Sequence, residues 1–391
     1  MSINSRFQPL LEQRQQQHLY RQRPLTFTAQ QAEMQINGLN VINFSSNDYL
    51  GLANDPLVKE TLVKALTDNN LSYGSGAAHL VTGHHLHHHL LEDEIADWLG
   101  TERALLFSTG YMANLAVQQT LMQTGDTILA DKLNHASLID GALQSDATLK
   151  RYPHLDMEAL ERRLKQNSAN QSMISTDGVF SMDGDIAPLA DILKLAKTHQ
   201  AWLMVDDAHG FGMLGNQGKG CFDYLGLQPT DDTILVGTLG KAFGTSGAFV
   251  AGSQVLIESL IQFARPYIYT TAMSPLNALA TRTALKRVIE AEPERQRLQQ
   301  HIQHFRQGAE SLGLKLWPSQ TAIQPIILGP SETALQWSEA LKQKGFWVTA
   351  IRPPTVPQGQ ARLRVTLSAG HSTEHINALL NALKQIQIAL L

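Results

Sequence analysis

Polar residues follow two apolar runs in the middle of the chain. The run 201–205 leads into Asp206 and His209. The run 233–236 leads into a glycine-rich segment that contains Lys241. Ligands of an open α/β sheet bind beyond the carboxyl ends of its strands. We therefore expect an acid, an imidazole and an amine to meet at one edge of a sheet.

Each segment alone has other interpretations. The residues around Asp206 are also typical of a strand-end turn with capping side chains, and no further ligand spacing supports a metal site there. Lys241 alone is typical of a surface lysine in a glycine-rich loop. A phosphate-binding P-loop is excluded, because Ala242 stands where Ser or Thr is required and the preceding glycines are too close.

The combination of the two segments is more specific than either part. A carboxylate beside a pyridine nitrogen keeps the ring protonated, so that the ring accepts electrons from a developing carbanion. A lysine amine forms a Schiff base with the cofactor aldehyde and later moves a proton. Asp206 and Lys241 therefore predict pyridoxal 5′-phosphate (PLP) as the cofactor.

A phosphate-binding segment should accompany this pair. Residues 107–114 run from an apolar strand into a helix, and Gly110 would let backbone N–H groups face an anion at the positive helix end. An ordinary strand–helix turn is the other interpretation. Thr238 adds a hydroxyl, Ser181 follows another strand, and His135 is suited to stack on the cofactor ring, although a lone histidine is more often structural.

A histidine-rich stretch occupies residues 84–89. Its spacings of three and four suit zinc ligands. It runs into an amphipathic helical pattern over 90–98, however, and solvated helix positions explain most of these histidines. We therefore expect no metal in this protein.

The elements that must position these residues alternate along the chain. Nearly continuous apolar strands separated by helices predict a mostly parallel sheet that is buried on both faces. The predicted strands are 104–107, 127–130, 172–176, 201–205, 233–236 and 247–251, and the predicted helices are 111–123, 156–166 and 188–199.

The two ends of the chain differ from this middle part. Leu10, Leu11, His18 and Leu19 recur at helical spacing, which predicts a polar helix over residues 1–24 that Pro24 ends. A strand at 41–44 and a loop at 45–52 follow. The C-terminal part has an amphipathic stretch over 275–312, strands at 322–328, 347–351 and 361–367, and a helix from about 372. We predict an N-terminal helix and strand segment (1–50), a large PLP-binding α/β domain (51–280) and a small C-terminal α+β domain (281–391).

Composition narrows the class of protein. The 391 residues carry a net charge of −4 with no long basic run, which argues against binding to nucleic acid. No apolar stretch is long enough to span a membrane. Cys221 is the single cysteine and fits a reducing compartment. Residues 1–23 lack the apolar centre of a secretory signal, so we expect a cytoplasmic protein.

Several motifs together resemble a known family. The chain is similar over essentially its whole length to the α-oxoamine synthases, which are fold-type I PLP-dependent transferases. One departure is Ala77-Ala78-His79, where relatives often have Gly-Ser-Arg or similar. The resembling stretches are 46–52, 134–137, 179–185, 205–210, 238–244, and 349–357 followed by 361–364.

The resemblance implies roles for individual residues. Lys241 is the Schiff-base lysine, Asp206 pairs with the ring nitrogen, and His135 stacks over the ring; these three are the expected catalytic residues. Segment 265–271 resembles the family segment that reaches a neighbouring subunit's cofactor phosphate, which implies a homodimer. The remaining cofactor contacts are Gly110, Tyr111, Ser181, His209, Thr238 and Thr271. The substrate contacts are Arg21, Asn47, His135, Arg352, Thr355 and Arg364, of which Arg364 clamps a carboxylate.

The resemblance also implies an activity. The stretch 351–357 is similar to that of family members that condense L-alanine with a pimeloyl thioester, with loss of carbon dioxide. The sequence leaves open whether coenzyme A or an acyl-carrier protein carries the acyl group. The alternatives are a glycine-dependent sister synthase, a PLP aminotransferase, and a PLP-binding protein without enzymatic activity.

Overall fold

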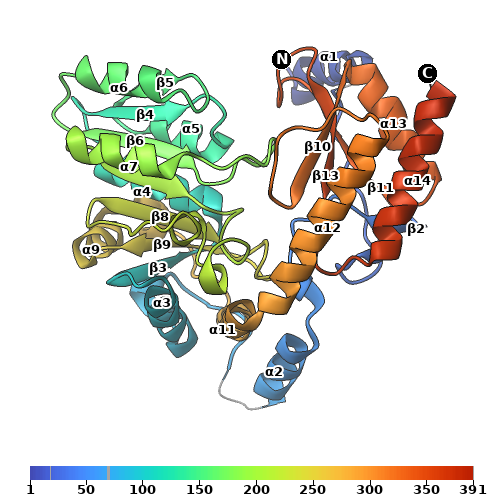
Figure 1. The fold of residues 1–391 in the computed structure, drawn as a ribbon. Coiled ribbons are helices and arrows are strands. Elements are labelled where there is room, and N and C mark those ends of the chain that lie inside the picture. The colour runs from blue at the N-terminus through green and yellow to red at the C-terminus, as the bar shows by residue number, and fades with distance from the viewer. Residues whose placement is uncertain (18, 68–70, 391) are drawn as a thin grey trace.

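The computed structural model describes residues 1–17, 19–67 and 71–390, which form two lobes (Figure 1). The large lobe is built around a seven-stranded sheet, and the small lobe around two three-stranded sheets. Both ends of the chain lie on the side of the small lobe. None of the helices within the described ranges is both long and apolar enough to cross a membrane.

The large-lobe sheet has the strand order β3-β9-β8-β7-β6-β4-β5. Strand β9 runs antiparallel to both of its neighbours, and every other pairing in this sheet is parallel. The predicted mostly parallel sheet is therefore confirmed. The strands are β3 (Arg103–Phe107), β4 (Thr127–Asp131), β5 (Thr148–Tyr152), β6 (Ser172–Asp177), β7 (Trp202–Asp206), β8 (Thr233–Thr238) and β9 (Ala248–Gly252).

Strand β5 is the one strand of this sheet that the sequence pattern missed. It lies at the edge of the sheet and pairs only with β4. Only Tyr152 in it is buried, while Lys150 and Arg151 contact solvent. An edge strand of this kind has no continuous apolar run, so its hydrophobic pattern does not predict a strand.

Helices cover both faces of the sheet (Figure 1). Successive strand residues enter two different hydrophobic clusters: Leu106 and Leu129 belong to one, and their neighbours Leu105 and Ile128 to the other. This alternation follows from the two-residue period of a strand. The helices of this lobe are α2 (Pro56–Thr67), α3 (Leu86–Leu99), α4 (Gly110–Leu121), α5 (Ala136–Gln144), α6 (Met157–Lys165), α7 (Leu189–Thr198), α8 (Cys221–Tyr224), α9 (Gln254–Phe263), α10 (Arg265–Ile268) and α11 (Pro275–Glu290).

The small lobe joins segments from both ends of the chain. One of its sheets pairs strands β1 and β2 with β11, and the other has the order β10-β13-β12. The boundaries that we proposed between domains therefore do not separate the N-terminal strands from the C-terminal part in space. The elements are β1 (Glu33–Ile36), β2 (Leu39–Asn43), α12 (Glu292–Ser311), β10 (Ile323–Gly329), α13 (Ser331–Gln343), β11 (Phe346–Trp347), β12 (Thr349–Ile351), β13 (Ala361–Thr366) and α14 (Thr373–Leu390).

Two predicted helices have different bounds. The amphipathic stretch 275–312 is divided between α11 and α12 at Ala291, and Pro293 occupies the first turn of the second helix, where its missing N–H costs nothing. The N-terminal helix α1 (Ile3–Gln16) ends well before Pro24, so that prediction was wrong. None of its residues is buried, and Leu10 and Leu11 are exposed, so no packing extends it. His18 lies outside the described residues.

The topology brings six strand ends to one edge of the large sheet, one of them from β5, which is parallel to β4. The other five concern the candidate site. Strands β4, β6, β7 and β8 are parallel, and β3 has the same direction because two antiparallel pairings relate it to β8. This edge therefore carries Asp131, Asp177, Asp206 and Thr238 at the strand ends, and the start of α4 just beyond β3.

Candidate active site

Lys241 lies just beyond the end of β8 and contacts a buried histidine. Its Nζ is 2.9 Å from His209 Nε2, and His209 Nδ1 is 2.6 Å from the Tyr49 hydroxyl. Burial, followed by the charge of Lys241, holds the pKa of His209 well below its usual range. His209 is therefore neutral, and a protonated Lys241 donates to Nε2 while Nδ1–H donates to the Tyr49 oxygen.

The environment of Lys241 favours an amine that titrates near neutral pH. Burial lowers the pKa of Lys241 to about 8, although the charges of Asp206 and Asp177 oppose this shift. The side chain can therefore both hold and release a proton under ordinary conditions.

Asp206 is the last residue of β7, and a hydrogen-bond network that includes two helices holds its carboxylate. Its Oδ2 accepts a hydrogen bond from Asn114 Nδ2 at 2.6 Å, and its Oδ1 accepts one from the Ala208 N–H at 3.1 Å. The same Asn114 amide donates to Ser137 Oγ at 2.8 Å. Asn114 lies on α4 and Ser137 on α5, so both helices orient the carboxylate. The sequence predicted no role for either residue, although Asn114 ends the predicted phosphate-binding segment 107–114.

A second carboxylate at this edge was also missed. Asp177 ends β6 as Asp206 ends β7, and its Oδ2 accepts a hydrogen bond from the His135 N–H at 2.7 Å. Burial, followed by the charge of Asp206, raises the pKa of Asp177 well above its usual range. An acid directly after the predicted strand 172–176 was the available signal.

His135 caps the start of α5. Its Nδ1 lies 2.7 Å from Ser137 Oγ and accepts from the Ser137 N–H at 3.3 Å. Reduced hydration in the cleft lowers the pKa of His135, and Asp206 opposes the shift, while part of the residue surface remains open to solvent.

The start of α4 faces the end of β8. A Cβ atom built on Gly110 would lie 4.0 Å from Thr238 Cβ, so these two predicted phosphate contacts are brought together. Thr109 caps the helix by accepting from the Met112 N–H at 3.2 Å. The exposed Tyr111 donates its hydroxyl proton to Asp140 on α5.

Arg364 on β13 reaches the large lobe. Its Nε donates to the Ser181 carbonyl at 2.7 Å, its Nη1 to Thr366 Oγ1 at 2.9 Å, and its Nη2 to Asn47 Oδ1 at 3.2 Å. No ion pair joins Arg364 to an Asp or Glu in the described chain. The structure thus brings Arg364, Asn47 and Ser181 together.

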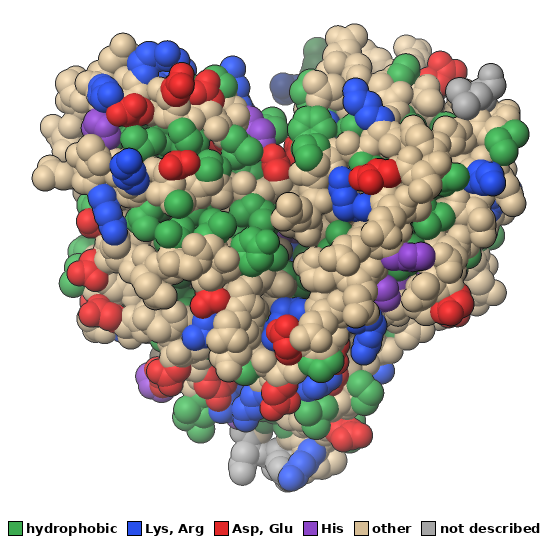
Figure 2. Space-filling view, viewed as in Figure 1, with side chains coloured by type: hydrophobic (Ala, Val, Ile, Leu, Met, Phe, Trp, Pro, Cys, Tyr) green, Lys and Arg blue, Asp and Glu red, His purple; other side chains and the backbone are tan. Residues whose placement is uncertain are grey.

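A cavity of about 630 Å³ opens where the lobes meet, and Figure 2 shows the surface hollowed between them. His135 and Ser181 line it from the large lobe, and Thr355, Val356 and Trp317 from the small lobe. The cavity therefore combines predicted cofactor contacts with predicted substrate contacts.

His154 in the wall of this cavity was not predicted. It lies 2.9 Å from Asp131 Oδ1 through Nδ1 and 2.8 Å from Asp185 Oδ2 through Nε2. Burial alone would lower the pKa of His154, but the two carboxylates raise it to about 9. The charged ring ties the turn after Ser181 to the end of β4.

Two of the remaining predicted site residues, Arg21 and Thr271, lie on the exposed surface. Arg21 is exposed beyond α1, and Thr271 is exposed next to Ala272, whose N–H donates to the Ala77 carbonyl. Within the part of the chain that is described, neither Arg21 nor Thr271 has a hydrogen bond to the residues around Lys241. The carbonyl of Arg352 accepts from the Thr355 N–H at 3.0 Å.

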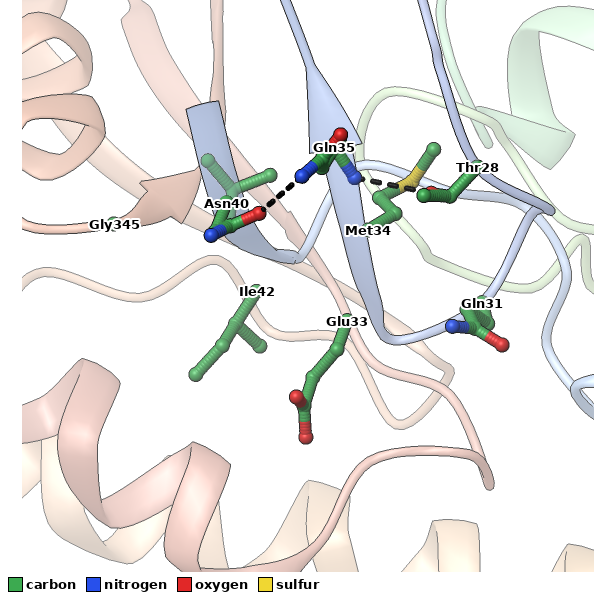
Figure 3. A pocket seen from close by; sticks show the side chains of 9 residues that line it. Thr28, Gln31, Glu33, Met34, Gln35, Asn40, Ile42 and Gly345 are labelled. Atoms are coloured by element: carbon green, nitrogen blue, oxygen red, sulfur yellow. Dashed lines mark hydrogen bonds between the residues drawn. The ribbon is translucent and has the colours of Figure 1, made fainter. Parts of the chain in front are cut away.

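Another cavity, of about 450 Å³, lies beside β1 and β2 and is shown in Figure 3. Gln35 lines it and bonds Asn40 through its side chain and Thr28 through its backbone N–H. Glu33 is the only ionisable side chain among the lining residues, and none of the predicted site residues lines the cavity. Of these two cavities, the one between the lobes is lined by predicted site residues, namely His135, Ser181 and Thr355.

Comparison with known proteins agrees with this geometry. A family model described as aminotransferase class I and II matches residues 40–383. An 8-amino-7-oxononanoate synthase of Hydrogenovibrio crunogenus is 70% identical over 388 residues, covering 99% of this chain and 97% of that protein. A structure of serine palmitoyltransferase with a PLP internal aldimine has 30% identity and a TM-score of 0.93, covering 100% of this chain and 99% of that one. The 8-amino-7-oxononanoate synthase of Francisella tularensis has 34% identity and a TM-score of 0.76, covering 90% and 99%.

Proposed function

Because the chain belongs to the 8-amino-7-oxononanoate synthases, within the class I and II aminotransferase family, we propose that it condenses L-alanine with a pimeloyl thioester. The products are 8-amino-7-oxononanoate, carbon dioxide and the free acyl carrier, in a reaction of biotin biosynthesis. The identity of 70% over nearly the whole chain carries this proposal. The residues around Lys241 would supply the chemistry that it requires.

The side chains at the sheet edge fit PLP. Asp206 is buried, yet no Lys, Arg or His side chain forms an ion pair with it among the described residues. A protonated ring nitrogen would compensate this charge. Lys241 would hold the cofactor aldehyde, and the start of α4 with Thr238 would hold the phosphate. When bound there, PLP draws electrons away from the Cα atom of a linked amino acid.

Lys241 is proposed to move the proton at the alanine Cα atom. With a pKa of about 8, its amine takes up a proton and returns it without a large energetic barrier. His209 receives the amine hydrogen bond, and Tyr49 holds the His209 ring in turn. This arrangement keeps the amine at the end of β8.

Arg364 is proposed to bind the carboxylate of L-alanine. Its three hydrogen bonds to Ser181, Thr366 and Asn47 fix the guanidinium and leave further N–H groups for a planar, two-pronged contact. The absence of an acidic partner for Arg364 in the described chain supports this role.

The cavity between the lobes is proposed to receive the acyl chain. Val356, Trp317 and Phe180 give it apolar walls, and Thr355 lies at its exposed rim. Arg21 and Arg352 are proposed to meet the far carboxylate or ester and the carrier's phosphates. We further propose a cytoplasmic homodimer in which Thr271 serves the neighbouring subunit's cofactor site.

Turnover of defined substrates tests the proposal. Purified protein with PLP would be given L-alanine or glycine with a panel of acyl thioesters, and the products identified by mass. We expect the highest kcat/KM for L-alanine with a pimeloyl thioester. A higher value for acetyl- or succinyl-CoA would replace the substrate assignment by a sister synthase. A spectral change on addition of amino acid, without turnover, would indicate a PLP-binding protein.

A further inference from the structure

A group of histidine and glutamate side chains lies at the N-terminal end of α3. His84 precedes the helix, and His89 and Glu92 lie one turn apart on it. Each offers one possible ligand atom, and these atoms all lie within 4.8 Å of one another. We propose that His84, His89 and Glu92 bind a divalent transition metal of the zinc class. The site goes beyond the proposed function and reverses our expectation of no metal.

Glu92 is the buried member of the group. It is 8% exposed, and its Oε1 accepts a hydrogen bond from the Leu106 N–H of β3 at 3.0 Å. Its Oε2 has no Lys or Arg partner among the described ion pairs, and faces His84 Nε2 at 4.0 Å. Burying a carboxylate without a cation is costly, so a metal between Glu92 and His84 would compensate its charge.

His84 is oriented by a second histidine. Its Nδ1 lies 3.0 Å from His79 Nδ1, which leaves Nε2 directed to Glu92. His79 is buried and stacks on Tyr267, with ring centroids 5.2 Å apart and planes 11° apart. A metal-binding histidine commonly uses its other ring nitrogen in a hydrogen bond that fixes the ring, and His79 has this role here.

The ring nitrogens of the neighbouring histidines already have hydrogen-bond partners. His79, His84 and His88 also lie close enough to share an ion. However, His88 Nδ1 accepts from the His85 N–H, and His88 Nε2 is 2.8 Å from the Met273 carbonyl. His87 Nδ1 receives Arg282 Nη1 at 3.0 Å. The nitrogens left for a metal are therefore His84 Nε2 and those of His89, whose Nε2 has only an exposed contact with Asp93 Oδ2 at 3.7 Å.

Two histidines and one carboxylate match a known zinc ligand set, which leaves a fourth position for water. His84 and His89 are exposed, so the metal has a direct path from solvent. Because Glu92 is bonded to β3, the ion would tie the segment before α3 to the central sheet. The consequence is structural: binding should raise the unfolding temperature of the folded protein.

Metal binding to the PLP-loaded protein tests the site. After chelator treatment and its removal, ZnCl2 is titrated in equilibrium dialysis, and bound zinc is measured by elemental mass spectrometry. We expect one zinc per chain and a rise in Tm. Glu92→Gln and His84→Asn should each weaken binding at least about tenfold. His87→Gln, from the same histidine run, should bind zinc as the unmodified chain does.

The result can overturn the proposal in two ways. Zinc binding that Glu92→Gln and His84→Asn leave unchanged would refute the ligand set, as would equal loss in His87→Gln. If Glu92→Gln does not fold, the exposed His89→Asn decides the question by the same dialysis. Cobalt(II) gives an independent reading, because a tetrahedral site produces strong visible absorption, which the His89→Asn protein should lose.

Discussion

The candidate site has two sides, a large-lobe wall at the edge of the central sheet and a small-lobe wall, and these are built differently. On the large-lobe wall, Asp206 and Lys241 stand at or just beyond the ends of buried strands, and buried partners hold them. On the small-lobe wall, Arg364 is held on a strand, but Thr355 stands on an exposed loop. Under the proposed function, the first wall supplies the charges near the reacting atoms, whereas the second binds the substrates. Substitutions should therefore reduce kcat on the first wall and mainly raise KM on the second.

The largest effect should follow from Lys241→Ala. Loss of the proton-transferring amine should lower kcat by about 10²–10⁴-fold or more, and remove the protein–cofactor link that borohydride reduces. The exposed Lys194→Ala on α7 serves as a matched control and should retain both properties. A reducible link that survives at the site in Lys241→Ala would show that another lysine holds the cofactor.

Asp206→Asn should rank second. An amide has a single oxygen, so it can accept only one of the hydrogen bonds that Asn114 and Ala208 donate to Asp206, and it supplies no charge to hold a ring proton. Removal of the alanine Cα proton should therefore slow by about 10²-fold. Exchange of that proton with deuterated solvent, followed by NMR, measures the step without the acyl donor. Exchange at the unmodified rate would sink this role for Asp206.

Arg364→Lys on the other wall should act on binding. A lysine has the charge but not the planar pair of donors, so KM for L-alanine should rise about tenfold while kcat changes less. Arg306→Lys provides a control, since that small-lobe arginine bonds the Trp317 and Ser319 carbonyls instead. A fall in kcat with unchanged KM would show that Arg364 acts in the chemical step, like the large-lobe residues, and not in substrate binding.

The smallest effect concerns the pH response of Lys241 before cofactor is added. Burial lowers its pKa to about 8, so the neutral, reactive amine should increase about fivefold between pH 7 and pH 8. Modification of Lys241 in the apoprotein by an amine-reactive reagent, measured by peptide mass spectrometry, should follow this curve. A midpoint near pH 10, as in a solvated lysine, would show that the Lys241 amine is not shielded from water.

The same pKa shift has a consequence for stability. An unfolded lysine binds its proton up to about pH 10.4, whereas the folded site releases it above about 8. The unfolded chain therefore holds more protons between these values, and this group favours folding more as pH rises through that window. The apoprotein tests the sign, because the linked cofactor removes the free amine.

The two walls also differ in how well sequence predicts them. Lys241, Asp206, His209 and Thr238 follow apolar runs, and parallel topology brings strand ends together, so their meeting was predictable. Asn114 and Ser137 escaped notice because they act through contacts between two helices that no local pattern records. The pairing of β2 with β11 joins distant segments and was equally invisible. The early end of α1 reflects the lack of packing partners, which periodicity cannot reveal.

That pairing of β2 with β11 has a consequence for how the protein is made. Residues Ile42 and Asn43 leave the ribosome early, but their partners Phe346 and Trp347 emerge only when most of the chain has been synthesised. Until then one edge of the β1–β2 hairpin has no strand beside it, which is an opening for unwanted association. The strands of the large sheet all lie between residues 103 and 252, so this sheet can assemble before β11 has been synthesised. Ribosome-bound chains that stop before residue 346 should therefore hold a folded large sheet and a β1–β2 hairpin whose β2 edge lacks its β11 partner.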